Sequence, residues 1–309
     1  MGSWKARWGI GRMSYLVPPG LYALGSPGPE APVVVTANYK MSYDCVRSAL
    51  AGRHVWLLVL ETFGINVWCA AGKGTFGTEE LVRRIAQTKL SQVVDHRSLL
   101  LPILGAAGIA AHEVARRSGF RIRYATIRAT DLPEYLDNGQ LTTPAMRELS
   151  FGLRERLVLI PVDLVLALKP TLAVAVVLFV LGWLGSDAGL GLALALALAF
   201  FGAVAAGTAA TPLLLPWLPG RSFAIKGAIC GLAWSLLWCS LAMPEMNLPL
   251  LTGTTLALTA VSSFYGLNFT GSTPFTSPSG VRKELRRALP VMALSLAAAA
   301  ILWLGTALF

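Results

Sequence analysis

The chain has 309 residues, a formal net charge of +10 and 55% apolar residues. Its four cysteines form no C-x-x-C pair, which argues against an internal iron–sulfur cluster or a cysteine-ligated zinc site. The positive charge does not predict nucleic-acid binding, because Arg121 and Arg123 alternate with apolar residues as on the solvent face of a strand. Anionic lipid headgroups account for the remaining basic residues.

The first half of the chain mixes charged and apolar residues as a soluble domain does. Its apolar runs predict strands at 31–39, 54–61 and 121–127, with helices before the second and third of them at 40–52 and 108–119. Residues 154–163 are expected to add a last strand. Strands that alternate with short helices indicate a mostly parallel α/β sheet, whose ligands bind beyond the carboxyl ends of the strands.

The stretch NVWCAAGKGTFGT, residues 66–78, lies too close to the strand at 54–61 to be its parallel neighbour, because a crossover needs a dozen or more residues. We therefore predict a short helix that Asn66 caps and that ends at Gly72. Thr78 is expected to cap the next helix, with Glu79 and Glu80 in its first turn, where the helix dipole favours acidic residues. Cys69 then lies midway along the short helix.

Four interpretations of Cys69 remain open from the residues alone. The thiol can be a buried structural group, or part of a phosphate-binding loop, although Val67 and Gly74 break the G-x-x-x-x-G-K-[ST] pattern. It can be a nucleophile, which would want a histidine partner. It can also be a ligand to cobalt or another soft metal centre.

The other cysteines and the histidines give weaker signals. Cys45 lies in a predicted helix, and Cys230 and Cys239 lie in an apolar span; all three are expected to pack as small apolar side chains. His54 and His112 are interpreted as structural residues. His96 is a candidate for lining a site at a strand end.

The second half of the chain contains apolar runs of the length that a helix needs to cross a bilayer. We predict five spans, at about 163–185, 187–208, 222–243, 247–267 and 288–308. The expected domains are therefore a soluble one, 1–161, and a membrane domain, 162–309.

The loops between the spans predict an orientation. Arg221, Lys226 and the basic cluster at 282–287 lie in the even loops, whereas the odd loops carry Asp187 and Glu245 and no basic residue. Because basic loops stay in the cytoplasm, the first domain is expected inside and the C-terminus outside. Residues 1–13 have no apolar core of a signal peptide, which agrees with a cytoplasmic first domain at the inner membrane.

The motif at 66–78 resembles the cap-helix signature of the membrane corrinoid protein of mercury methylation, the HgcA family. The likeness continues through VVVTANYKMSYD at 33–44, LVLIPVDL at 157–164 and NFTGSTPFTSPSGV at 268–281, and it includes the five-span tail.

This resemblance implies a Rossmann-like corrinoid-binding domain, related to that of the corrinoid iron–sulfur protein of acetyl-CoA synthesis, followed by an all-α membrane domain of five helices. The implied cofactor is a cobalamin in its base-off form, with Cys69 as catalytic residue and lower axial ligand to cobalt. The implied activity is a corrinoid-dependent methyltransferase that passes a methyl group from cobalt to Hg(II) and forms methylmercury.

The resemblance and the strand-end positions together give a set of expected cofactor-binding residues. They are Asn66, Val67, Trp68, Cys69, Ala70, Ala71, Gly72 and Lys73 on the cap helix, and Thr36, Asn38, Thr62, Thr126 and Thr130 at the strand ends. The implied partners are a small ferredoxin with two 4Fe-4S clusters as electron donor, a methyl-folate donor acting through another protein, and membrane lipid.

Two further expectations concern the membrane half. The alternative function is a membrane transporter or anchor that carries a cobalamin-binding module, although charged residues are scarce in the spans. Residues 268–281 have the composition of a flexible linker, but the predicted topology places them on the cytoplasmic side. We expect this loop to approach the corrinoid domain or the redox partner.

Overall fold

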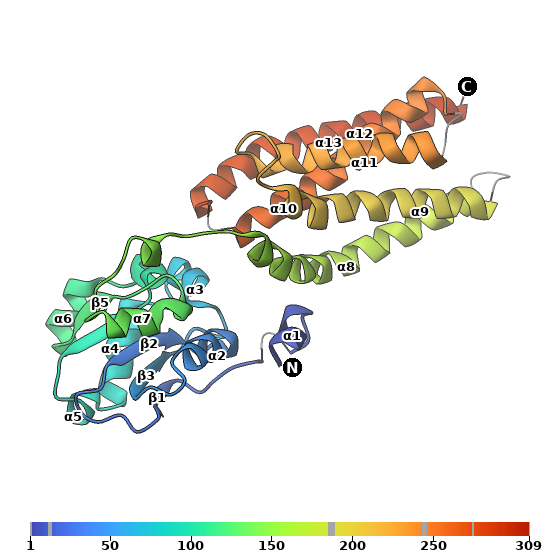
Figure 1. Cartoon of the computed structure of the whole chain (residues 1–309). Coiled ribbons are helices and arrows are strands. Elements are labelled where there is room, and N and C mark those ends of the chain that lie inside the picture. Colours follow the sequence, from blue (N-terminus) through green and yellow to red (C-terminus); the bar gives the residue numbers. More distant parts are fainter. Residues whose placement is uncertain (1, 12–13, 185–188, 243–245, 274, 309) are drawn as a thin grey trace. The chain divides into compact units, whose positions relative to one another are not determined.

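The computed structural model describes residues 2–11, 14–184, 189–242, 246–273 and 275–308 (Figure 1). Asp187 and Glu245, which were used to predict the loops, lie outside the described residues. The chain forms two compact units, one up to Ser150 and one from Phe151 onward.

The first unit is built on a five-stranded sheet with the order β1-β3-β2-β4-β5. The strands are β1 (Gly20–Leu24), β2 (Val33–Ala37), β3 (Val55–Leu60), β4 (Ser98–Leu101) and β5 (Arg121–Tyr124). Strands β3, β2, β4 and β5 are parallel to one another, and β1 pairs with β3 in the antiparallel direction. The three strands predicted in this unit are confirmed, and β1 and β4 are additional.

Helices cover both faces of this sheet. They are α2 (Lys40–Ala49), α3 (Val67–Lys73), α4 (Thr78–Gln87), α5 (Leu90–Val93), α6 (Ala111–Ser118) and α7 (Leu132–Asp137). A further short helix, α1 (Gly2–Arg7), begins the described chain. Short 3-10 turns lie at η1 (Ile103–Gly108), η2 (Ala129–Asp131) and η3 (Ala145–Arg147).

Alternation along β2 divides the core between the two faces. Val33 and Val35 pack with Leu81 of α4 and with residues of α5 and α6. Val34 points the other way and packs with Leu132 of α7 and with residues of α2. The expected α/β arrangement is therefore confirmed, and Thr36, two residues after Val34, shares the α2/α7 face.

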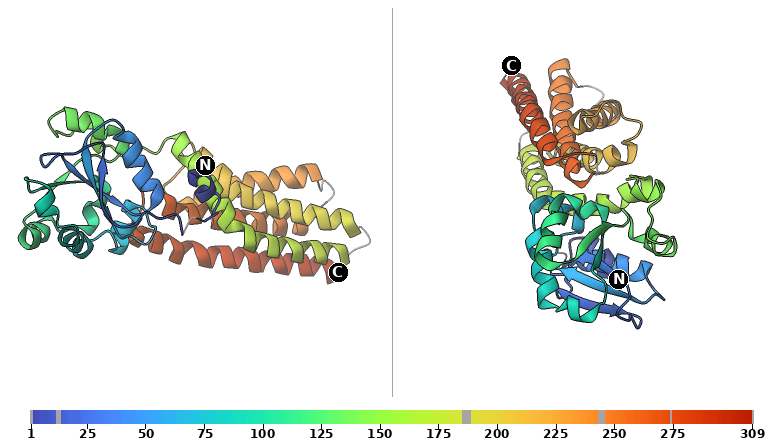
Figure 2. Two further views of the ribbon diagram at one scale, coloured as in Figure 1. Left: turned by 90° about the horizontal axis from the view of Figure 1, so that it is seen from below. Right: turned by 90° about the vertical axis from the view of Figure 1, so that its left-hand side faces the viewer.

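The second unit is entirely helical in its described residues. It contains α8 (Leu153–Leu184), α9 (Gly189–Ala205), a π-helical turn η4 (Ala206–Ala210), α10 (Thr211–Leu214), α11 (Phe223–Ala242), α12 (Leu248–Asn268), a 3-10 turn η5 (Phe269–Ser272) and α13 (Pro278–Leu308). Five of its helical segments are long and apolar enough to cross a membrane. Helix α8 packs on α9, and α12 packs on both α11 and α13 (Figure 2).

The expected strand at 154–163 is wrong, because these residues are the first turns of α8. A short apolar run does not by periodicity alone distinguish a strand from the start of a buried helix. Here the apolar run continues without a break into the following apolar residues. The helix therefore begins at Leu153, and its backbone N–H and C=O groups bond within the helix.

Small residues allow the helices of this unit to approach closely. A Cβ atom on Gly227 of α11 would lie 2.7 Å from the backbone oxygen of Ser262 of α12. Two serines of α12 bond across the same interface, Ser262 Oγ to Gly227 O and Ser263 Oγ to Ala224 O, each at 2.8 Å. The apolar helices thus form a specific bundle.

Candidate functional site

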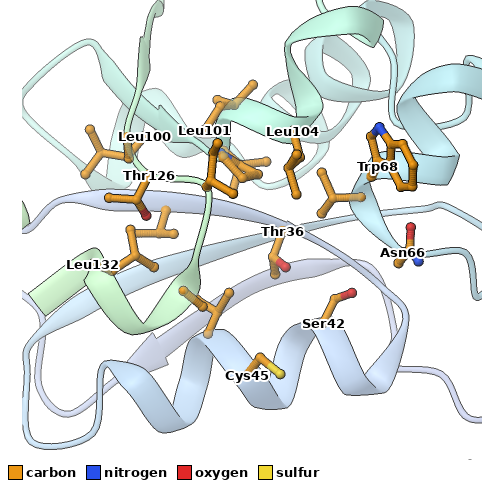
Figure 3. A pocket seen from close by; sticks show the side chains of 18 of the residues that line it. Thr36, Ser42, Cys45, Asn66, Trp68, Leu100, Leu101, Leu104, Thr126 and Leu132 are labelled. Atoms are coloured by element: carbon orange, nitrogen blue, oxygen red, sulfur yellow. The ribbon is translucent and has the colours of Figure 1, made fainter. Parts of the chain in front are cut away.

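A pocket of about 390 Å³ lies at the carboxyl ends of β2, β4 and β5, on the face that α2 and α7 cover (Figure 3). The strand ends contribute Thr36, Leu101 and Thr126. The first turns of α2 contribute Met41, Ser42 and Cys45, and α3 contributes Asn66, Val67 and Trp68. Most of the lining is apolar, and a few hydroxyl, thiol and amide groups point into it.

The topology of the sheet explains why the pocket forms there. After β2 the chain enters α2 on one face and returns as β3; after β4 it enters α6 on the other face and returns as β5. The two connections leave neighbouring strands in opposite directions, which opens a crevice between β2 and β4. This reversal is where ligands bind in open α/β sheets.

Helix α3 is held at the edge of this pocket by its own caps. Asn66 has an extended backbone, and its Oδ1 accepts a hydrogen bond of 2.9 Å from the N–H of Cys69, as expected of an N-cap. The helix ends at Gly74, whose φ of 80° is the left-handed conformation that glycine adopts easily. The predicted end at Gly72 is therefore wrong, since Gly72 is helical.

The predicted cap of the following helix is also corrected. Gly77 occupies the N-cap position of α4, and Thr78 is the first helical residue. The Oγ1 of Thr78 instead accepts a hydrogen bond of 2.8 Å from the N–H of Ala110, which ties α4 to the start of α6. Glu79 and Glu80 lie in the first turn of α4, as predicted.

The faces of α3 have different surroundings. Ala70 and Ala71 are buried in the core beside Gly108, where an added Cβ would lie 3.0 Å from the Cα of Ala71. Val67 and Trp68 line the pocket. With 3.6 residues per turn, Cys69 lies on the side of α3 away from Ala70 and Ala71, half-exposed and outside the pocket lining.

The structure brings together five of the residues that the sequence predicts to bind a cofactor. They are Thr36, Asn66, Val67, Trp68 and Thr126. Thr126 Oγ1 donates to the backbone oxygen of Arg128 at 2.7 Å. Thr36 is 1% exposed, and its Oγ1 has no hydrogen-bond partner among the described residues. A buried hydroxyl without a partner costs free energy, and the residue that carries this one lines the pocket.

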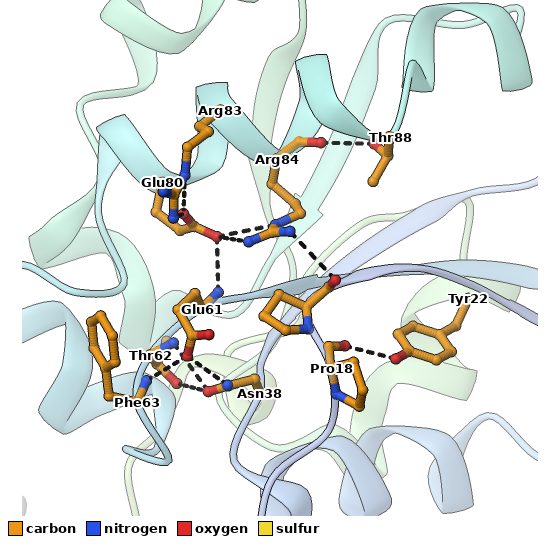
Figure 4. Close-up of polar contacts among 11 residues, drawn as sticks. Pro18, Tyr22, Asn38, Glu61, Thr62, Phe63, Glu80, Arg83, Arg84 and Thr88 are labelled. Carbon is orange, nitrogen blue, oxygen red and sulfur yellow. Dashed lines mark hydrogen bonds and ion pairs between the residues drawn. The ribbon is translucent and has the colours of Figure 1, made fainter.

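The remaining strand-end residues have structural surroundings. Asn38 Oδ1 accepts from the N–H and the hydroxyl of Thr62, at 3.0 and 2.8 Å, and from the N–H of Gly64 at 3.3 Å (Figure 4). Both side chains are buried in this network, which holds the turn before α3. Thr130 is exposed and bonds to Asp131 at 3.2 Å. Gly72 and Lys73 are exposed at the end of α3.

A buried carboxylate also holds the same turn. Glu80 of α4 accepts hydrogen bonds of 2.9 Å from the N–H of Glu61, 2.8 Å from Arg83 Nε and 2.7 Å from Arg84 Nη2 (Figure 4). Burial raises the pKa of the Glu80 carboxyl, but these bonds outweigh burial and hold the pKa below its ordinary value of 4.5. Glu61 Oε1 in turn accepts from Asn38 and from the N–H of Phe63.

Sequence reasoning missed the contribution of α2 to the pocket. Cys45 is exposed and lines the pocket, so the expectation that it packs as a small apolar residue is wrong. The sequence contains a signal for this contribution. Met41 and Ser42 precede Cys45 by four and three residues at the start of α2, so the three share the face of the helix that is turned to the end of β2. Cys230 and Cys239 are buried, as predicted.

The histidines lie away from the pocket. His96 precedes β4 and so lies at the amino ends of the parallel strands, opposite the pocket, where its Nε2 is 2.9 Å from the backbone oxygen of Ala31. His54 Nδ1 accepts from the N–H of Ser26 at 2.8 Å, and His112 is exposed. Among the described residues, no three His, Cys, Asp or Glu side chains form a metal-binding group.

Comparisons relate the first unit to proteins of one enzyme system. A family model described as CO dehydrogenase/acetyl-CoA synthase delta subunit matches residues 12–118. The gamma subunit of the acetyl-CoA decarbonylase/synthase complex of Methanopyrus kandleri is 34% identical over 123 residues, which cover 39% of this chain and 26% of the relative. That of Archaeoglobus fulgidus is 39% identical over 92 residues, which cover 29% and 20%. The chain thus spans about a quarter of the length of the curated relatives it matches.

These matches correct the expected family. The model and the relatives name subunits of acetyl-CoA decarbonylase/synthase and not the mercury-methylation family. The reason lies in where the resemblance was found. The motif at 66–78 falls inside the matched residues 12–118, and a motif in a domain that different proteins share identifies the domain and not the reaction.

The Glu80 network makes a prediction that depends on pH. Glu80→Gln removes the negative charge that accepts hydrogen bonds from Glu61, Arg83 and Arg84. We expect the free energy that protects the turn at 61–64 from hydrogen exchange to fall by about 1–3 kcal/mol at pH 7. Because the folded pKa is below 4.5, this stabilisation is present above pH 4.5 and is lost as the pH falls through the folded pKa. The difference between wild type and variant should therefore shrink at acid pH.

Hydrogen–deuterium exchange of residues 61–66 in the purified full chain measures this protection. Glu79→Gln is the matched control. Glu79 lies in the same turn of α4 as Glu80, but its side chain is exposed and pairs with Arg117 of α6. Equal exchange in the two variants at pH 7 would contradict a supporting role for Glu80.

Proposed function

We propose that the first unit is a Rossmann-like corrinoid-binding domain and that the chain acts as a membrane-anchored, corrinoid-dependent methyltransferase. The observation that carries the proposal is the position of α3, which presents the Cys69 thiol outward beside a pocket at the reversal of the sheet. The similarity of residues 12–118 to subunits of acetyl-CoA decarbonylase/synthase supports a role in one-carbon transfer.

The residues present fit part of a corrinoid. A pocket of about 390 Å³ is near the lower end of the range for ligand cavities, so it suits an appendage of such a cofactor, and the larger ring would remain outside. Its apolar walls suit a flat organic group, and the unpartnered Thr36 hydroxyl offers one hydrogen bond. We infer that Thr36, Asn66, Val67, Trp68 and Thr126 hold a cobalamin in its base-off form.

Cys69 is the proposed lower axial ligand and catalytic residue. When bound, the cobalt would supply a carrier for the methyl group, and Cys69 would be the residue of this chain that holds the cobalt. The Asn66 cap and the buried face formed by Ala70 and Ala71 fix α3, and thereby fix the thiol. A thiolate donates more electron density than a neutral imidazole, which favours release of the methyl group to an electrophile.

The acceptor that we propose is Hg(II), with methylmercury as product, because an electrophilic metal ion takes up a methyl group together with its electron pair. The comparisons favour a second candidate, a methyl acceptor in an acetyl-CoA decarbonylase/synthase complex, for which the relatives are named. The two proposals share the cofactor and Cys69 and differ in the methyl acceptor.

The proposed partners follow from what the chain lacks among its described residues. These residues contain no cysteine cluster for iron and sulfur, so reducing electrons would come from another protein, for which we propose a small ferredoxin with two 4Fe-4S clusters. A methyl-folate acting through a second protein is the proposed donor.

We further propose that the second unit anchors the protein in the cytoplasmic membrane, with the first unit inside and the C-terminus outside. The alternative role, a transporter with a cobalamin-binding module, would place ionisable groups along the spans. The loop at 268–281 is proposed to approach the corrinoid domain or the redox partner. Its described residues are not a loose linker, because Phe269, Thr270 and Thr273 are buried within the second unit.

The role of Cys69 is tested by two substitutions at equal corrinoid loading. Cys69→Ala should change the visible spectrum of the bound corrinoid while retaining most binding, because the pocket residues remain. Cys69→His should bind corrinoid and become methylated, yet lose most methyl transfer to Hg(II). Spectra and transfer rates that match wild type would reject the ligand role, and transfer only to an acetyl-forming partner would replace Hg(II) as acceptor.

The role of Thr36 is tested by Thr36→Val, which replaces an unpartnered hydroxyl by a methyl group of similar volume. We expect the corrinoid-free protein to gain about 1 kcal/mol in stability, since a buried unsatisfied group is removed. Corrinoid affinity should fall severalfold by equilibrium titration. Thr130→Val is the control, because Thr130 is exposed and lies outside the pocket lining. Unchanged affinity in Thr36→Val would remove the hydroxyl from the binding site.

The orientation is tested by reporter fusions at Asp187 and at Ser277. Because the basic loops are proposed to stay inside, Ser277 should report the cytoplasmic side and Asp187 the outer side. Activity of both fusions on one side of the membrane would reject the proposed orientation.

A further inference from the structure

A second pocket, of about 480 Å³, lies entirely within the second unit. It is formed by the first turns of α8 and α11, the turn after α10 and the residues that follow η5. Three of its lining residues are cationic: Arg156, Lys226 and Arg221. None of the contacts that define the proposed corrinoid site involves this pocket.

Two of these cations are buried. Arg156 is 5% exposed and Lys226 is 7% exposed, whereas Arg221 is open to solvent. Arg156 Nη1 donates to the backbone oxygens of Pro212 and Leu213, at 3.1 and 2.6 Å. These carbonyls belong to the end of α10, where a helix leaves such groups unpaired.

Lys226 caps the same turn. Its Nζ donates to the backbone oxygens of Leu215 and Leu218, at 2.9 and 2.5 Å. Backbone carbonyls at a helix end carry only about half a negative charge in total. They therefore orient the two side chains but do not neutralise them.

Among the residues that the structure describes, no Asp or Glu lines this pocket. Glu155, next to Arg156 in the chain, accepts a hydrogen bond of 2.5 Å at its Oε2 from the N–H of Gly152. Glu284 of α13 is directed elsewhere, since its Oε1 accepts from Ser222 Oγ at 2.7 Å and from the N–H of Ala224 at 2.9 Å. Buried charges without a counter-charge are costly, so two of them beside one hollow indicate a missing anion.

The donors that remain unused point to an anion with several oxygens. A guanidinium has five N–H donors, and the described bonds of Arg156 use only Nε and Nη1. An ammonium has three donors, of which Lys226 uses two. The dipole of a helix end favours a cation, but its partial charge of about half an electron balances only part of the two charges.

The rest of the wall is apolar. Phe151, Phe223 and Phe275 line the same pocket, and the rings of Phe151 and Phe275 meet edge to face with centroids 5.7 Å apart. Phe275 is 62% exposed. Arg156 and Lys226 belong to the first turns of helices apolar enough to cross a membrane, which is the depth at which headgroups lie.

We propose that this pocket binds the phosphate of an anionic phospholipid headgroup, with Arg156, Lys226 and Arg221 facing the phosphate oxygens and the phenylalanines facing the adjoining glycerol and acyl carbons. Basic pockets between the ends of membrane helices recognise such headgroups. The proposal concerns lipid recognition by the second unit and does not depend on the corrinoid.

The test uses the full chain, purified in a neutral detergent and freed of lipid. Binding of phosphatidylglycerol, phosphatidylcholine and inorganic phosphate is measured by native mass spectrometry and by the shift in melting temperature. Phosphatidylglycerol should bind and stabilise, and phosphatidylcholine should bind at least several-fold more weakly. Inorganic phosphate that binds as tightly as phosphatidylglycerol, and competes with it, would overturn the lipid as the source of the phosphate.

Matched variants separate the pocket from general surface charge. Arg221→Gln removes an exposed cation that lines the pocket and should weaken phosphatidylglycerol binding about fivefold. Arg286→Gln removes an exposed cation of α13 outside the pocket lining and should change it less than twofold. Equal losses in the two variants would overturn the proposal. Lys226→Met, where it folds, should abolish the preference for phosphatidylglycerol, and retention of that preference would also overturn it.

Discussion

The hydrogen-bonded pairing of β2 with β4 is the constraint on which the candidate site depends. The two strands share a register at Val33–Leu99, yet the chain leaves them on opposite faces and toward opposite edges of the sheet. The strand ends are therefore not covered by a single connection, and α2 borders one side of the crevice while η1 borders the other. The opposite directions of the two connections keep the space at these strand ends open to a ligand.

Helix α3 converts that space into a chemically defined site. A helix of seven residues is too short to be stable by itself, so its position is determined by what it packs against. Ala70 and Ala71 fit because Gly108 carries no side chain, and the network of Asn38, Glu61 and Glu80 holds the turn that leads into the helix. The thiol of Cys69 is thus fixed beside the pocket by groups that do not touch it.

Sequence patterns predicted the parts of the fold whose signal is long or local. The buried runs that became β2 and β3 and the Asn66 cap were recognised from single stretches, and five apolar helices followed from span length. Strand β4 was missed because its three consecutive leucines are too few to show a strand periodicity. The strand at 154–163 was predicted wrongly because its apolar run is the beginning of a longer one.

The candidate site was predictable only in part, because a polar residue at a strand end has two possible roles. Thr36 is the last residue but one of β2 and Thr62 comes two residues after β3, and their sequences give no reason to separate them. In the fold, Thr36 faces the α2 side and finds no partner, whereas Thr62 faces Asn38 and bonds to it. The hydroxyl of Thr62 is occupied by its bond to Asn38, 24 residues away in the chain. A contact between such distant residues cannot be predicted from the local pattern of a single sequence.

The two units differ in the partners of their buried charged side chains. Glu80 is buried but meets three donors, so its charge is neutralised within the fold and has no need of a ligand. Arg156 and Lys226 are equally buried, but the described residues offer them only carbonyl oxygens. A fold that tolerates two uncompensated cations loses stability unless the surroundings supply an anion. With the second unit in a membrane, as we propose, the helix ends would lie at the lipid headgroups, and the phosphate of a headgroup is the counter-charge that we propose for Arg156 and Lys226.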